Sequence, residues 1–336
     1  MDYRNLGQSG LMVSPICLGA MMFGGQTDSK TAGQIVSIAR DSGVNFIDAA
    51  DVYNRGEAER IVGKHLAQDR DKWVLATKAG SPMGSGPNEG GLGRKWLLQA
   101  IDGSLDRLST DYVDVWYLHK PDAVTPMEES LSAVADVLAS GKARYWGISN
   151  HRGWQIADAV RGADGLGMAR PVVCQPYYNL LNRAPEVEVL AACDHYGIGV
   201  VPYSVLARGV LTGKYKAGAE PEPGSRAGRA EKRIMETEFR EESLAIAEKI
   251  AEHAKARGMT AADFAMLWIL DNGIVSSALA GPRTVEQWEG YLGSLRHNFT
   301  AEDEALVDSL VAPGHPSTPG YSDPQYPLTG RRPQTG

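Results

Sequence analysis

The chain has 336 residues, of which 43% are hydrophobic and 22% charged, with a formal net charge of −7; this is the composition of an ordinary globular protein. The acidic balance and the scattered Lys and Arg residues argue against nucleic acid or an anionic membrane as a partner. The sequence has neither a secretory leader pattern nor the roughly 18 to 20 consecutive apolar residues of a membrane-spanning helix, so we expect a cytoplasmic protein.

Strand patterns recur along most of the chain. Residues 2–13 indicate a small hairpin that we expect to close the bottom of a barrel. From residue 16 to residue 294, short apolar runs alternate with amphipathic stretches, which is typical of a parallel sheet built from βαβ units. The apolar runs predict eight strands, at residues 16–20, 45–50, 73–78, 113–119, 143–149, 172–176, 199–204 and 275–281.

Helical patterns lie between the predicted strands. Asp28 precedes the first helix and Gly43 follows it, as a start and a stop signal. Residues 94–108 and 127–139 have the apolar spacing of a face that packs on a sheet. Residues 301–311 predict one extra helix, and six of the 18 prolines follow it, so we expect an extended tail over residues 312–336 that wraps the surface.

The number of strands favours a closed barrel. Eight βα units in about 280 residues match a (β/α)8 TIM barrel, whereas a doubly wound open sheet usually has fewer strands and a second domain. We therefore predict a single α/β domain over residues 1–336 with its core at 16–311. Two long loops, 81–93 and 217–233, are predicted to be lids or binding loops, with tolerated insertions as the alternative.

Four ionisable residues follow successive predicted strands. In a barrel of this kind, residues at the C-terminal strand ends share one mouth. Asp48 and Tyr53 follow the second strand, Lys78 ends the third and His119 ends the fourth. Each of them alone is more often a structural residue. Together at successive strand ends, they predict a catalytic site.

This set of side chains suits the reduction of a carbonyl, which needs a hydride donor and a proton donor to the oxygen. Tyr53 fits the role of proton donor. An ammonium about 4 Å away would lower the pKa of a phenol by at most about three units from about 10, so the phenol would be more acidic and still protonated near neutral pH. Asp48 would keep a buried Lys78 charged, and His119 would orient the carbonyl oxygen.

From LGAMMFGG to GPRTVEQW the sequence resembles the aldo-keto reductase family. The Asp-x4-Tyr pair with the following Gly56 and Glu57, then Lys78, then His119, is similar to the catalytic tetrad of that family. The resemblance implies Tyr53 as general acid, Lys78 and Asp48 as its tuning pair and His119 as the group that orients the substrate. The implied reaction is a reversible, NADPH-dependent reduction of an aldehyde or ketone, with keto-sugars and cyclic ketones among the possible substrates.

The cofactor site is not of the Rossmann type. No G-x-G-x-x-G follows a predicted strand, and GVLTGK is one residue too short for a phosphate loop. The resemblance implies NADP(H), with Ser149, Asn150 and Gln175 on the carboxamide and Tyr203 stacked on the nicotinamide ring. The complete set of predicted cofactor residues is Gly19, Met21, Asp48, Ser149, Asn150, Gln175, Tyr203, Ser204, Leu206, Arg208, Lys214, Gly281, Arg283 and Gln287.

The start of the last barrel helix favours NADP(H) over NAD(H). Backbone N–H groups and Arg283 there suit an anion such as the adenosine 2′-phosphate, although a solvated surface arginine is the alternative. Gly290 and Tyr291 depart from the family pattern, since a Glu-Asn pair commonly contacts adenine at these positions. The residues predicted to contact the substrate are Met22, Tyr53, Trp116 and His119.

Two other functions are possible on the same barrel. One is an NADPH-binding regulatory subunit similar to the potassium-channel β subunits, which resemble this family but depart from the tetrad at the histidine position. The other is a glycosidase with Asp48 and Asp51 as its carboxylate pair; three residues apart at a strand end, these side chains should point to opposite faces. As binding partner we expect a small carbonyl compound or alcohol. The sequence leaves the oligomeric state open between a monomer and a small homo-oligomer.

The three cysteines, Cys17, Cys174 and Cys193, show no metal-ligand spacing, and their odd number is not that of a disulfide framework. We expect buried thiols and no metal site.

Overall fold

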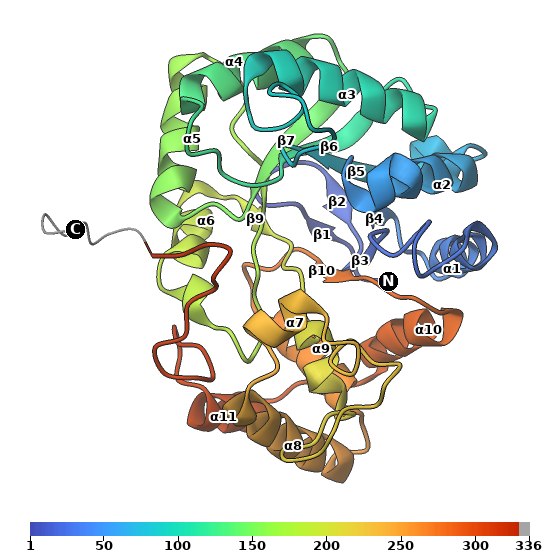
Figure 1. The fold of residues 1–336 in the computed structure, drawn as a ribbon, viewed down its shortest axis with the longest axis vertical. Helices are drawn as coiled ribbons and strands as arrows, with labels where there is room; N and C mark the ends of the chain where they lie inside the picture. Colours follow the sequence, from blue (N-terminus) through green and yellow to red (C-terminus); the bar gives the residue numbers. More distant parts are fainter. Residues whose placement is uncertain (329–336) are drawn as a thin grey trace, which may run out of the picture.

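The computed structural model describes residues 1–328, and at its centre lies a barrel of eight parallel strands surrounded by helices (Figure 1). The strands pair in the order β10, β3, β4, β5, β6, β7, β8, β9. A bridge between Val200 and Val275 joins the two ends of this order. The strands are β3 (Ile16–Gly19), β4 (Phe46–Asp48), β5 (Val74–Ala79), β6 (Val113–Leu118), β7 (Ala143–Ser149), β8 (Val173–Gln175), β9 (Gly199–Val200) and β10 (Ala278–Ala280). The predicted (β/α)8 barrel is confirmed, with every predicted strand present.

The helices lie outside the strands and pack on them through apolar faces. The first helix begins after Asp28, whose side chain accepts a hydrogen bond from the backbone N–H of Thr31 at 2.7 Å, as an N-cap should. Three helices rather than one separate β9 from β10. The helices are α1 (Ser29–Asp41), α2 (Glu57–Leu66), α3 (Arg94–Leu108), α4 (Met127–Ala139), α5 (Gly153–Gly165), α6 (Val189–Tyr196), α7 (Lys232–Thr237), α8 (Glu241–Ala256), α9 (Ala261–Asp271), α10 (Val285–Gly293) and α11 (Ala301–Leu310). Within residues 1–328, no helix combines the length and the apolar character needed to cross a membrane.

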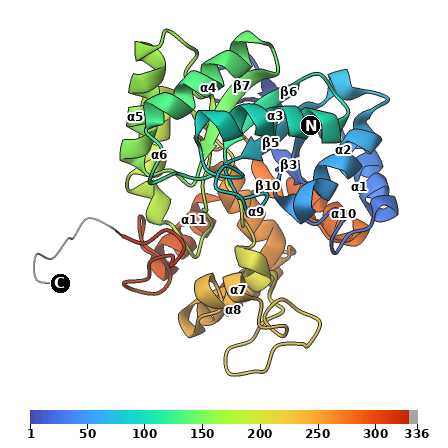
Figure 2. The same cartoon turned by 45° about the horizontal axis from the view of Figure 1, so that its top comes forward.

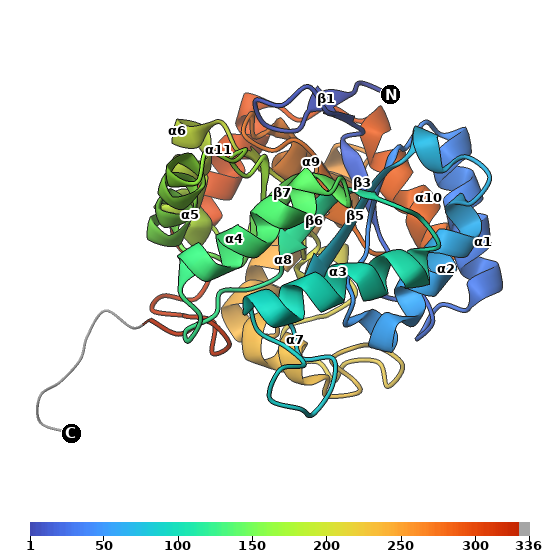
Figure 3. The ribbon, with the colours of Figure 1, turned by 90° about the horizontal axis from the view of Figure 1, so that it is seen from above.

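The N-terminal hairpin closes one end of the barrel. It consists of β1 (Arg4–Asn5) and β2 (Met12–Val13), which pair antiparallel. Leu6 and Val13 are fully buried and belong to the apolar cluster that fills the barrel interior. Figure 3 shows the hairpin at one end of the molecule and α7 at the opposite end. The predicted closure of the barrel bottom is confirmed, and the other end stays free for a site.

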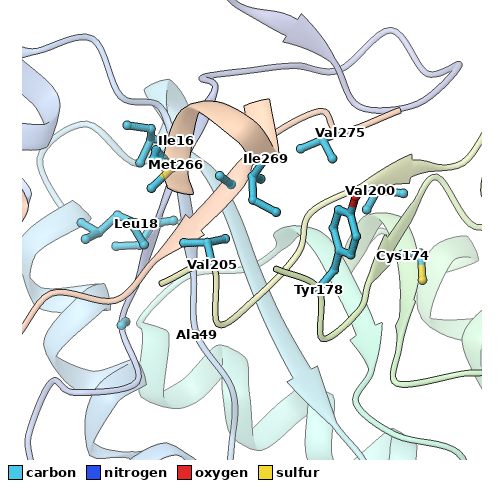
Figure 4. Close-up of a cluster of buried hydrophobic side chains, with 14 of the residues drawn as sticks. Ile16, Leu18, Ala49, Cys174, Tyr178, Val200, Val205, Met266, Ile269 and Val275 are labelled. Atoms are coloured by element: carbon cyan, nitrogen blue, oxygen red, sulfur yellow. The ribbon is translucent and has the colours of Figure 1, made fainter. Parts of the chain in front are cut away.

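A second apolar layer lies between the strands and the helices (Figure 4). Met266 and Ile269 of α9 belong to this layer together with Ile16 and Leu18 of β3, and all four side chains are buried. Because both faces of a parallel strand are covered in this way, the strands contain almost only apolar residues until their polar C-terminal ends. The predicted burial of the three cysteines is also confirmed, since Cys17, Cys174 and Cys193 are buried free thiols.

The chain returns along the surface after α11. The backbone N–H of Arg183 donates to the carbonyl of His315 at 3.0 Å, and the N–H of Ser317 donates to the carbonyl of Leu181 at 2.8 Å. The extra helix that we predicted at 301–311 is present as α11. After it, the tail runs over the surface from residue 312 to residue 328. The remainder of the predicted tail, 329–336, lies outside the described residues.

Candidate active site

The C-terminal ends of the barrel strands open into a cavity of about 760 Å³. This volume lies within the range of about 300 to 1,000 Å³ that is typical of small-molecule sites. The wall includes strand ends, residues of α10, part of the loop before α7 and two residues of the C-terminal tail. Figure 2 shows this loop projecting beside α7 and α8. The cavity is thus at the end of the barrel where sites of this fold are found.

An unusual turn presents Tyr53 to the cavity. The two residues that follow it and Gly56 have positive φ angles, and Gly56 has φ 88°. A Cβ atom at Gly56 would also lie 2.5 Å from Cδ of Arg107, so only glycine fits there. The Asn54 amide donates to the carbonyl of Phe23 at 2.7 Å and secures the turn. The backbone therefore holds the phenol in one position.

Lys78 connects the other members of the predicted tetrad. Its fully buried ammonium donates to the Asp48 carboxylate, to the carbonyl of Ala49 at 2.7 Å and to the Tyr53 hydroxyl at 3.3 Å. The second carboxylate oxygen of Asp48 accepts a hydrogen bond from the Gln175 amide at 3.0 Å. A buried ion pair is tolerated when its remaining donors and acceptors are satisfied, and all three donors of this ammonium have partners.

The charges of this group differ in one respect from the prediction. Burial raises the pKa of the Tyr53 phenol, the Lys78 ammonium offsets part of this rise, and the Asp48 carboxylate adds to it. Burial by itself lowers the pKa of Lys78, but Asp48 and Tyr53 outweigh burial and raise it. Lys78 is therefore charged, as expected, and Tyr53 is protonated at neutral pH. The predicted net lowering of the Tyr53 pKa is wrong, because it left out burial and the Asp48 charge.

His119 stands beside Tyr53 as a neutral ring. The two rings meet edge to face, with centroids 5.9 Å apart and an interplanar angle of 83°. Burial lowers the pKa of His119 to about 3, with a further contribution from the Lys78 ammonium. The Asn150 amide donates to the backbone carbonyl of His119 at 2.9 Å. The imidazole can thus act as a neutral hydrogen-bond partner at neutral pH.

Every residue of the predicted cofactor set lines this cavity. The hydroxyl of Tyr203 donates to the Asn150 side chain at 2.8 Å, and its ring stacks on Tyr177 with centroids 5.7 Å apart. The Ser149 hydroxyl donates to the carbonyl of Gln175 at 2.8 Å. Side chains from three different strand ends are therefore held in one fixed arrangement beside Asp48.

The comparisons with known proteins agree with this geometry. A model of the Aldo/keto reductase family matches residues 15–312. The chain belongs to the aldo/keto reductase family. Its general activity is therefore that of an oxidoreductase, and the resemblance noted in the sequence is confirmed.

Relatives of this aldo/keto reductase include two kinds of protein. This chain is 42% identical over 288 residues to a probable voltage-gated potassium channel subunit beta of Arabidopsis thaliana, and the match covers 84% of this chain and 87% of the relative. A protein with the same description from Oryza sativa subsp. japonica is 41% identical over 286 residues, with the same coverage. The uncharacterized oxidoreductase YrpG of Bacillus subtilis (strain 168) is 37% identical over 336 residues, covering 96% of this chain and all of the relative.

The loop over residues 204–209 of the reductase is strained. Ser204, Ala207 and Arg208 all have φ angles between 47° and 64°, a region that costs a residue other than glycine on the order of 1 to 3 kcal/mol. Hydrogen bonds hold the conformation, from the Asn179 amide to the carbonyl of Ser204 at 3.0 Å and from Arg208 Nε to the Thr237 hydroxyl at 3.1 Å. Such strain is concentrated at binding sites, which agrees with the position of this loop in the cavity wall.

Three arginines gather in one part of the wall. Arg226 is mostly buried; burial lowers its pKa, and the nearby cations Arg208 and Arg283 lower it further, against the opposing effect of Glu231. A cluster of guanidinium groups favours a polyanionic ligand. The sequence had indicated the loop over 217–233 but not Arg226 itself, because this segment contains three arginines and no pattern shows which of them enters the wall. None of residues 81–93, the other long loop, lines the cavity.

Trp116 does not reach the cavity, in contrast to Met22, Tyr53 and His119. Its side chain is 1% exposed and lies in the apolar layer between strands and helices. Successive residues of a strand face opposite sides, and in β6 it is Tyr117 that faces the barrel interior. The predicted contact of Trp116 with the substrate is corrected accordingly. Sequence reasoning missed Gln325 and Tyr326, which do line the cavity and follow no strand end.

Asp51 is separated from Asp48, as the parity of the strand end predicts. It is buried outside the cavity wall, and burial together with the Glu59 carboxylate raises its pKa to about 7. Arg107 binds Glu59 at 2.6 Å beside it. The two aspartates do not face one shared cavity, so this arrangement does not support a glycosidase.

Proposed function

We propose that this aldo/keto reductase reduces an aldehyde or a ketone to the alcohol, reversibly, with NADP(H) as cofactor and Tyr53 as general acid. One observation carries the proposal: the protonated phenol of Tyr53 lies 3.3 Å from a buried, charged Lys78 at the edge of the cavity. A carbonyl oxygen near that hydroxyl would meet a proton donor whose conjugate base is stabilised by the ammonium.

The residues present fit the cofactor. The clustered guanidinium groups of Arg208, Arg226 and Arg283 suit phosphate groups, and the ring of Tyr203 suits a flat nicotinamide. Asn150 and Gln175 offer amides to the carboxamide. When bound, the nicotinamide supplies the hydride.

The protein's own residues carry the proton. Tyr53 donates the proton of its hydroxyl to the carbonyl oxygen as negative charge develops there, and the Lys78 ammonium stabilises the phenolate that remains. Asp48 keeps Lys78 charged, and Gln175 holds Asp48 in place. The neutral His119 orients the carbonyl oxygen. General acid catalysis of this kind typically contributes about 10² to 10⁴ in rate.

The preference for NADP(H) over NAD(H) rests on the start of α10. Thr284 caps this helix by accepting a hydrogen bond from the N–H of Gln287 at 3.2 Å. The Gln287 side chain accepts from the N–H of Arg283 at 2.9 Å. A cationic helix start suits the 2′-phosphate. Gly290 and Tyr291, the departure from the family pattern, also line the cavity, so we propose that Tyr291 takes a place beside the adenine.

A second candidate function is that of an NADPH-binding regulatory subunit. The similarity to two proteins described as probable channel subunits supports it. The ordered tetrad, with His119 present, favours catalysis. A cytoplasmic location and a monomeric or small homo-oligomeric state stay predictions.

One experiment separates these functions. NADPH and NADH are titrated by fluorescence, and NADPH oxidation is then followed with a panel of aldehydes and ketones. The reductase proposal expects tighter binding of NADPH than of NADH and multiple turnovers with at least one carbonyl. Tight NADPH binding without turnover on the whole panel would favour the regulatory subunit instead.

A further inference from the structure

The C-terminal tail contributes to the wall around the proposed carbonyl site. Gln325 and Tyr326 line the same cavity as Tyr53 and His119. Tyr326 is partly buried, and burial raises the pKa of its phenol to about 12, with the Tyr53 hydroxyl among the nearby groups. At neutral pH the tail therefore presents an uncharged aromatic ring to the site.

This part of the tail is held on two sides. The Asp323 carboxylate accepts two hydrogen bonds from the Arg233 guanidinium, at 3.0 and 2.7 Å. Both side chains are largely buried, with 11% of Asp323 and 24% of Arg233 exposed. On the other side, Arg152 Nη2 donates to the carbonyl of Tyr326 at 2.6 Å. A bidentate, largely buried pair of this kind fixes orientation far better than an exposed one.

The ion pair also links two covers of the cavity. Arg233 lies in α7, directly after the loop that brings Arg226 to the cofactor side. Asp323 lies three residues before Tyr326, on the substrate side. One pair of side chains thereby joins the segment that would cover the phosphate groups to the segment that would cover the carbonyl.

We propose that Tyr326 is a specificity-determining residue that favours aromatic carbonyl substrates over small aliphatic ones, and that the Arg233–Asp323 pair positions it. The inference rests on the proposed reductase function. An aryl aldehyde or aryl ketone whose oxygen meets Tyr53 would pack its ring against the Tyr326 ring. A short aliphatic aldehyde would not extend to it.

The ring is tested with Tyr326→Ala and Tyr326→Phe, using para-nitrobenzaldehyde and propanal as probes. Aromatic contacts of this kind predict that Tyr326→Ala raises the KM for para-nitrobenzaldehyde about fivefold while the KM for propanal changes less than about twofold. Tyr326→Phe, which keeps the ring, should retain the wild-type ratio of the two KM values. The affinity for NADPH is measured in each variant and should not change, which shows that the site is folded.

The positioning role is tested with Asp323→Asn, which removes the bidentate anionic partner of Arg233 and leaves it the longer, 3.3 Å pair with Glu236. It should move the KM ratio in the same direction as Tyr326→Ala. The matched control is Asp164→Asn, which breaks an equally close but exposed pair with Arg170, outside the cavity, and should leave the ratio unchanged.

Unchanged KM ratios in both Tyr326→Ala and Asp323→Asn, with an active wild type, would overturn this inference alone. A changed KM ratio in Asp323→Asn together with an unchanged KM ratio in Tyr326→Ala would overturn the role of the Tyr326 ring. If the wild type oxidises no NADPH with any carbonyl, the proposed function fails, and this inference fails with it.

Discussion

Replacing Tyr53 by Phe removes one oxygen atom and leaves the ring that packs beside His119. The hydroxyl accepts a long hydrogen bond, 3.3 Å, from Lys78, which keeps the Asp48 carboxylate and the Ala49 carbonyl as partners. The loss of stability should therefore be at most about 1 kcal/mol. Loss of the proton donor should reduce kcat about 10² to 10⁴-fold, equivalent to roughly 3 to 5 kcal/mol of barrier. The large loss of rate with a small loss of stability is the signature of a general acid.

The assay compares the rate of NADPH oxidation, NADPH affinity by fluorescence and urea unfolding in the wild type and the variant. Tyr196→Phe is the matched control, since Tyr196 lies on α6 outside the cavity wall, and it should leave all three quantities unchanged. The affinity of Tyr53→Phe for NADPH should stay within about twofold of the wild type, because the residues proposed to bind the cofactor do not use the proton of the Tyr53 hydroxyl. A Tyr53→Phe enzyme that keeps most of its turnover would refute the assigned role of the phenol.

Three further predictions follow from the charges around the cavity. Asp48→Asn removes the anion that raises the pKa of Lys78, so burial dominates and the alkaline limb of the kcat profile should move to lower pH; an unchanged limb would contradict the pairing. Arg226→Gln should weaken NADPH binding about tenfold in a fluorescence titration, and equal affinity would show that this guanidinium does not face the cofactor. In the folded protein His119 has a pKa of about 3. Its contribution to the free energy of unfolding is therefore fully present above the pKa of the unfolded chain, about 6.5, and is lost as pH falls toward about 3. Urea unfolding at several pH values should show a shallower decrease of stability in His119→Gln than in the wild type.

The sequence alone predicted the fold and the tetrad for the same physical reason. The strands of a parallel barrel are buried on both faces, so each appears as an apolar run, and all eight runs form strands. The C-terminal ends of such strands meet at one mouth. Asp48, Tyr53, Lys78 and His119 could therefore be placed together from their positions along the chain.

Only the tertiary structure decided which way some side chains face and what surrounds them. The apolar character of β6 does not show whether Trp116 or Tyr117 faces the barrel interior, because both faces are buried and the choice depends on register. The net pKa shift of Tyr53 is a sum of burial and two opposite charges, which requires the complete environment. Tyr326 lines the cavity in a segment that is held by an ion pair and a hydrogen bond to residues distant in the chain, and no local pattern encodes such contacts.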